Sequence, residues 1–79
     1  MAISPNFQNR FIELVDNLEE SNKASIAKQM NVNYVTFSKI YNYGILPKVV
    51  ILIRIADFFN ISIEYLLSKT NDEYFDKAQ

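Results

Sequence analysis

The sequence lacks the residue types on which most enzyme chemistry depends. Its 79 residues include no cysteine, no histidine and no tryptophan, and only one glycine and two prolines. The absence of cysteine excludes disulfides and thiolate chemistry, and it suits a reducing compartment. The absence of histidine removes the commonest metal ligand and the usual general base. No nucleophile–base pair, metal motif or cofactor motif is recognisable either, so we expect no enzymatic activity, no metal and no cofactor.

Long hydrophobic runs are also missing. The most apolar window, residues 49–59 (VVILIRIADFF), is too short to cross a bilayer and contains Arg54 and Asp57, so it predicts a buried helix. The N-terminal stretch MAISPNFQNR has no charged segment followed by an apolar one, which argues against a secretion signal. These features predict a cytoplasmic protein that does not associate with membranes.

Acidic residues are absent from residues 21–56, although the formal net charge of the whole chain is −1. The same stretch holds five basic residues, which are Lys23, Lys28, Lys39, Lys48 and Arg54. This segregation predicts one positive surface on a mildly acidic body, and such a surface steers toward phosphate. Chance clustering of solvated lysines is the alternative explanation.

Apolar residues recur at helical spacing along the whole chain, which predicts an all-α domain of five short helices. The expected helices cover residues 5–20, 23–30, 34–43, 47–59 and 63–69. Side-chain caps are expected before four of them, at Ser4, Asn22, Asn33 and Ser62. Asn31 and Asn60 are expected to adopt the left-handed conformation at tight turns, and Gly44 is expected to end the third helix.

The same spacing predicts which side chains are buried. The inward positions of the first three helices are Phe7, Phe11, Leu14, Val15, Leu18, Ile26, Ala27, Met30, Phe37 and Ile40. Tyr65 is expected in the core with its hydroxyl at the rim. Arg54 is expected to pair with Asp57 or another acidic residue, and Lys28 is expected to be solvated. Val50 and Ile51 fit either packing within the chain or a protein interface.

The second and third expected helices are joined by a three-residue turn, which predicts a helix-turn-helix. The stretch IAKQMNVNYVTFSKIYNYG, the proline at position 47 and the ending IADFFNISIEYLL together resemble the Cro and phage-repressor family, also called the xenobiotic-response-element type. The resemblance implies a five-helix lambda-repressor-like DNA-binding domain over residues 1–69. Residues 70–79 would then form a polar tail, with at most a short helical turn.

The resemblance also implies a sequence-specific regulator of transcription that represses a prophage or other mobile element. Residues 34–42 would form the recognition helix in the major groove of double-stranded DNA. Base contacts are expected from Tyr34, Val35, Thr36, Ser38 and Lys39. Phosphate contacts are expected from Lys23, Asn42 and Lys48. Val35 could pack on a thymine methyl group, and Ser38 or Tyr34 could hydrogen-bond a base edge.

A homodimer on an inverted-repeat operator is expected, because a single small domain makes few phosphate contacts. The expected dimer interface contains Ile63, Leu67, Tyr74 and Phe75. The chain ends soon after the fifth helix, so we expect no ligand-sensing domain.

The sequence departs from the family pattern at several places. Asn31 and Asn60 replace the glycines that the family has at the turn and after the fourth helix, and the left-handed conformation tolerates this change. Tyr34 stands where the family often has Arg or Gln, and Val50 and Ile51 stand where it often has Glu and Thr. The apolar surface from Tyr41 to Ile51 therefore supports two alternatives. One is an antitoxin-like protein that also binds a protein partner there. The other is an interaction module that keeps the fold without binding DNA.

Overall fold

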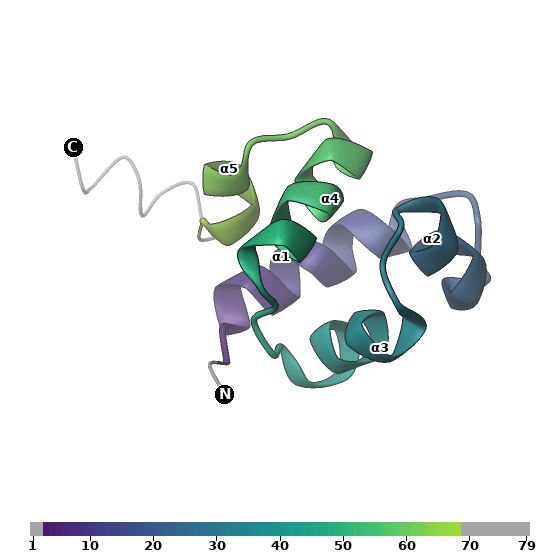
Figure 1. Cartoon of the computed structure of the whole chain (residues 1–79), viewed down its shortest axis with the longest axis horizontal. Coiled ribbons are helices and arrows are strands. Elements are labelled where there is room, and N and C mark those ends of the chain that lie inside the picture. The colour runs from purple at the N-terminus through teal and green to yellow at the C-terminus, as the bar shows by residue number, and fades with distance from the viewer. Residues whose placement is uncertain (1–2, 69–79) are drawn as a thin grey trace.

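The protein folds into five α-helices. The computed structural model describes residues 3–68 and contains no β-strand within them. The helices are α1 (Pro5–Asp16), α2 (Lys23–Gln29), α3 (Tyr34–Tyr43), α4 (Val49–Phe59) and α5 (Ile63–Leu67). Helix α1 contacts both α3 and α5, while α2 packs on α3 and α4 packs on α5 (Figure 1). The predicted all-α class is confirmed, and none of the described helices is long and apolar enough to cross a membrane.

Four helices begin at the side-chain caps that the sequence predicts. The Phe7 N–H donates to Ser4 Oγ (3.3 Å) and the Ser25 N–H to Asn22 Oδ1 (3.1 Å). At the later helices the caps are Asn33, which accepts from the Val35 N–H at 2.7 Å, and Ser62, which accepts from the Tyr65 N–H at 3.0 Å. Each cap satisfies a backbone donor that the first turn of a helix leaves without a partner.

Three predicted turns adopt the left-handed conformation. The φ angles are 60° at Asn31, 69° at Gly44 and 57° at Asn60. Asn and Gly are the residues that enter this region at least cost, so each can reverse the chain within a short connection. Gly44 ends α3 and Asn60 ends α4.

Helix α1 ends at Asp16, four residues before the predicted end. The Leu18 N–H donates to the Val15 carbonyl (3.1 Å), which is an i to i−3 bond that tightens the last turn. The half-buried Leu18 then packs against the core, and the chain turns toward α2 instead of continuing the helix.

The sequence predicts that the fourth helix begins at Pro47, but α4 begins two residues later, at Val49. Lys48 is extended (ψ 157°) and its carbonyl accepts the first helical bonds from Ile51 and Leu52. Helix α5 ends at Leu67 because Ser68 is extended, and the Ser68 hydroxyl donates to the Tyr65 carbonyl (2.7 Å).

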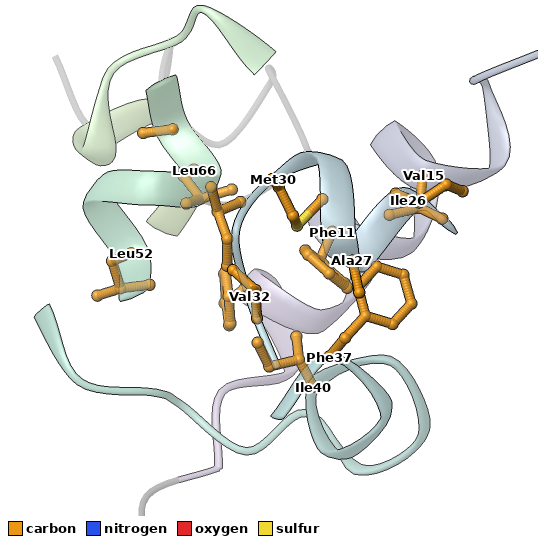
Figure 2. Close-up of a cluster of buried hydrophobic side chains, with 13 residues drawn as sticks. Phe11, Val15, Ile26, Ala27, Met30, Val32, Phe37, Ile40, Leu52 and Leu66 are labelled. Atoms are coloured by element: carbon orange, nitrogen blue, oxygen red, sulfur yellow. The ribbon is translucent and has the colours of Figure 1, made fainter. Parts of the chain in front are cut away.

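The core consists of 13 buried hydrophobic residues (Figure 2), which are Phe7, Phe11, Val15, Ile26, Ala27, Met30, Val32, Phe37, Ile40, Leu52, Ile55, Ala56 and Leu66. Most of the predicted inward residues belong to this set, and Leu14 and Leu18 pack half-buried at its edge. The ring centroids of Phe11 and Phe37 lie 5.1 Å apart with an interplanar angle of 66°. Edge-to-face pairs of this kind stabilise by about 1 kcal/mol beyond area burial, and this pair connects α1 to α3.

Three packing predictions were wrong. Tyr65 is 45% exposed, because its ring lies against the guanidinium of Arg10 (4.0 Å from Cζ to the ring centroid) and not inside the core. Helix α4 buries only the face that carries Leu52, Ile55 and Ala56, so the helix is amphipathic and not buried all round. Arg54 donates to the Asn31 carbonyl (3.2 Å) and forms no salt bridge with Asp57, which is also within the described residues.

Candidate nucleic-acid interface

Helices α2 and α3 are held together through a tight connection. The Val32 N–H donates to the Ala27 carbonyl (2.9 Å), and the Asn31 N–H donates to the Lys28 carbonyl (3.0 Å). The small side chain of Ala27 is 1% exposed and faces the packed interior. Together with the buried Phe37, these contacts fix the orientation of α3 relative to α2, and the outer face of α3 is presented as a rigid surface.

The outer face of α3 carries most of the predicted contact residues. Tyr34 and Val35 are 50% and 58% exposed, and Asn42 is also exposed, while Ser38 is half-buried. A helical period of 3.6 residues places these four residues on one stripe. The Asn42 side-chain amide donates to Ser38 Oγ (2.9 Å), so the two polar groups hold each other in place.

Three aromatic side chains of α3 contact one another along the helix, and we call them the aromatic row. The Tyr34 and Phe37 rings are stacked with centroids 6.3 Å apart, and the Phe37 and Tyr41 rings are stacked at 6.2 Å. Tyr41 Oη donates to the Asp16 carboxylate (2.7 Å). This hydrogen bond is the main cause that raises the pKa of the Tyr41 phenol, and burial and the Asp16 charge act in the same direction.

Lys23 lies beside this row. Its ammonium is 4.7 Å from the centroid of the Tyr41 ring, and the side chain is half-buried. The cation–π contact places the ammonium at the junction of α2 and α3 and next to the Tyr41–Asp16 hydrogen bond. The Lys23 ammonium thus lies against the Tyr41 ring at the edge of the candidate interface.

Three other residues predicted to contact DNA line a groove between α3 and the start of α4. Its volume is about 510 Å³, and its apolar floor is formed by Ile45, Leu46, Val50 and Ile51. Thr36 and Lys39 line the α3 side of the groove, and Lys48 lines it from the connection to α4. Lys39 and Lys48 are exposed, whereas Thr36 is half-buried. The structure therefore assigns Thr36 to the groove and not to the stripe that contains Tyr34.

The expected dimer interface is described only in part. Ile63 is half-buried and packs against the core, and Leu67 is 37% exposed on α5. Tyr74 and Phe75 lie outside the described residues, as does the predicted tail over residues 70–79. No group of three or more His, Cys, Asp or Glu side chains that could hold a metal ion occurs within residues 3–68.

Two basic residues that the sequence interpretation set aside lie near the N-terminal end of α3. Lys28 and Arg54 line a second hollow of about 420 Å³ that also contacts Tyr34. The signal for them was their place in the acid-free stretch, but only the tertiary fold brings the two side chains together.

None of the protein-family models, characterised proteins or solved structures that were compared with this chain matches it. The relation to the Cro and phage-repressor family stays a prediction from the sequence.

Proposed function

We propose that this protein is a sequence-specific DNA-binding regulator of transcription, most simply a repressor. Helices α2 and α3 act as a helix-turn-helix in a lambda-repressor-like domain, and α3 enters the major groove as the recognition helix. The observation that supports this most is the two-sided character of α3. Phe37 and Ile40 are fully buried on one side, while the other side presents an outer stripe free of acidic residues.

The exposed groups match the chemistry of base edges and phosphates. Val35 offers an apolar surface for a thymine methyl group, and Tyr34 and Ser38 offer hydroxyls that both donate and accept. Lys39 reaches a base or a phosphate from the adjoining turn of the helix. Tyr34 stands where the family often has Arg or Gln, so a bidentate contact from that position is missing. Lys39 can still pair with both acceptors of a guanine, and apolar and hydroxyl contacts carry most of the remaining sequence preference.

Phosphate contacts come from Asn42 at the C-terminal end of the stripe and from Lys23 and Lys48, which lie outside it. The protein binds as a homodimer on an inverted repeat, with half-sites about one helical turn (~34 Å) apart. The α5 surface around Ile63 and Leu67 supplies the dimer contact. Occupation of the operator then blocks RNA polymerase in the cytoplasm, and the regulated genes belong to a prophage or another mobile element.

Selection from a random pool of double-stranded DNA tests this proposal. The wild-type chain is expected to enrich an inverted repeat with half-sites one turn apart. Lys39→Ala and Tyr34→Ala are expected to lower affinity for the enriched sequence by roughly five- to a hundredfold each, as for the loss of 1–3 kcal/mol of base contact. Lys28→Ala removes the same charge without a proposed base contact, so it should weaken binding to all sequences alike. A pool that stays random after selection would refute the proposal.

The groove supports a second candidate, in which the same fold binds a protein. Val50 at its floor is 50% exposed, and Val49 and Tyr43, from the same stretch of the chain, are 66% and 65% exposed. Large exposed apolar side chains that gather on one surface mark interaction sites on small domains. An antitoxin-like protein or an interaction module would use the surface from Tyr41 to Ile51. Val50→Ser would then weaken capture of the partner and, because it adds no charge beside Lys39 and Lys48, leave any DNA affinity in place.

A further inference from the structure

The groove between α3 and α4 combines an apolar floor with two cations at its edges. Val50 and Ile51 lie at the floor, and Lys39 and Lys48 line the sides. Among residues 3–68, no acidic side chain lines it. This chemistry fits a segment in which large apolar side chains stand directly beside carboxylates, because burial of the former and charge pairing of the latter act together.

The chain itself contains such a segment. Residues 72–76 read DEYFD, so Tyr74 and Phe75 are neighbours, with Asp72 and Glu73 before them and Asp76 after them. This segment follows the described residues, and it is the only place in the sequence where two adjacent aromatic residues are flanked on both sides by acids.

The distances within the fold allow the segment to reach the groove. Ser68 accepts a hydrogen bond from Arg10 on α1 (3.3 Å), and the Ser4 N–H at the start of α1 donates to the Gly44 carbonyl (2.9 Å). Arg10 and Ser4 are about 9 Å apart along the helix axis at a rise of 1.5 Å per residue. Ile45, at the floor of the groove, directly follows Gly44. The six residues from Ser68 to Tyr74 can extend over about 20 Å, so about 11 Å beyond this axial component are left to span the Arg10 side chain and the offset of the groove from the axis of α1.

We propose that residues 72–76 bind in the groove of their own chain, with Tyr74 and Phe75 on the apolar floor and the carboxylates beside Lys39 and Lys48. A linker this short gives an effective concentration in the millimolar range. A contact with a dissociation constant of about 100 µM would therefore close the groove for about nine-tenths of the time. Tyr74 and Phe75 then serve this intramolecular contact in place of the dimer contact that the sequence predicts.

A regulatory consequence follows, and it rests on the proposed function. The bound segment covers Lys39 and Lys48, which, together with Thr36, are the groove residues expected to contact DNA. A groove closed for nine-tenths of the time lowers the measured DNA affinity about tenfold. DNA and the acidic segment thus compete for the same two lysines, and a partner that captures the segment would activate DNA binding.

A spin label tests the docking directly, because the chain has no cysteine and a single one can be introduced at Ala78. In the full chain carrying Ala78→Cys with a nitroxide, we expect paramagnetic broadening of the Thr36, Lys39 and Ile51 amide signals. The Tyr74→Ser/Phe75→Ser variant, which preserves the net charge, should remove that broadening. Equal broadening over the whole domain, or none at the groove, would overturn the proposal.

A mixed sample separates the chain's own segment from that of a second copy. Spin-labelled protein without ¹⁵N is mixed with ¹⁵N-labelled protein that carries no spin label. We expect no broadening at the groove in this sample, and broadening there would overturn the assignment to the same chain.

DNA affinity of the Tyr74→Ser/Phe75→Ser variant distinguishes the two proposals. An increase of about tenfold supports both. Broadening at the groove in a protein that prefers no DNA sequence would leave the docking standing and refute the proposed function. If the wild type binds DNA sequence-specifically, the variant has the same affinity and no broadening occurs at the groove, the proposed function would stand and the docking would be refuted.

Discussion

Gly44 ends α3, and its carbonyl accepts a hydrogen bond from the Ser4 N–H at the start of α1. Its replacement by alanine gives a sharply defined prediction. Its φ of +69° lies in the left-handed region, where a residue with a Cβ is strained. A Cβ at this position would also lie 2.8 Å from Gln8 Oε1 and 3.0 Å from Gln8 Cδ. Gln8 cannot simply move away without loss, because its side-chain amide donates to the Tyr41 carbonyl (3.1 Å) at the end of α3.

The expected loss of stability has two parts. The left-handed conformation costs alanine about 1–2 kcal/mol, and the smaller conformational freedom of unfolded alanine returns about 0.4–1 kcal/mol. Displacement of Gln8 removes a hydrogen bond worth about 0.5–1.5 kcal/mol. Gly44→Ala should therefore lower the free energy of unfolding by about 0.5–3 kcal/mol, or the melting temperature by several degrees for a domain of this size.

Urea unfolding of four proteins separates the two parts, namely the wild type, Gly44→Ala, Gln8→Ala and the double variant. Gln8→Ala removes Oε1 and Cδ but keeps the Cβ, so Gly44→Ala should cost about 0.5–1.5 kcal/mol less in the Gln8→Ala background. Additive effects of the two substitutions would refute the role of Gln8. A Gly44→Ala variant as stable as the wild type would refute the backbone strain as well.

Three further substitutions test the contacts between helices. Tyr41→Phe removes the hydrogen bond to Asp16 and should cost about 1 kcal/mol at pH 8. The pKa of Tyr41 is raised in the folded protein, so the contribution of its hydroxyl to stability is complete below pH 10 and falls as the pH rises further. Urea unfolding should therefore show a smaller difference in stability between wild type and Tyr41→Phe at pH 10.5 than at pH 8. Arg10→Ala removes the cation–π contact with Tyr65 and should cost about 2 kcal/mol in thermal unfolding, and Arg10→Lys should recover little of it; full recovery by lysine would contradict the need for a planar guanidinium. Phe37→Ala should cost about 3–5 kcal/mol by leaving a cavity in the core, and a variant that loses less than 1 kcal/mol would show that this region is loosely packed.

Local features of this fold could be predicted from the sequence because they depend on neighbours along the chain. Asn33 and Ser62 cap helices through backbone groups two or three residues away, and Gly44 ends α3 through its own conformation. The burial of Phe37 and Ile40 follows from helical spacing alone. These positions would be predictable in any chain with the same local pattern.

Features that depend on how helices pack could not be predicted. Arg10 is only 6% exposed, and its guanidinium lies against Tyr65 on α5. Nothing in the sequence near Arg10 indicates this contact. The end of α1 at Asp16 depends on Leu18 packing against the core. Long-range contacts of this kind override local propensity, and a helical pattern carries no record of them.

The candidate interface divides in the same way. The resemblance to the Cro and phage-repressor family named Tyr34, Val35 and Ser38 as base contacts, and helical geometry places the three residues on one stripe of α3. The groove depends on the position of α4 relative to α3, so its combination of Lys39 and Lys48 around an apolar floor emerges only from the fold.

The measurement that tests the central claim most directly is fluorescence anisotropy of the wild-type protein with a selected DNA and with a scrambled DNA of the same composition, at about 50 and 200 mM salt. Three lysines from each copy of a dimer, Lys23, Lys39 and Lys48, predict a loss of roughly a thousandfold in affinity over this range for the selected DNA. The account predicts submicromolar binding to the selected DNA at the lower salt concentration and a clear preference over the scrambled DNA at both. Equal affinity for the two DNAs at both salt concentrations would contradict it.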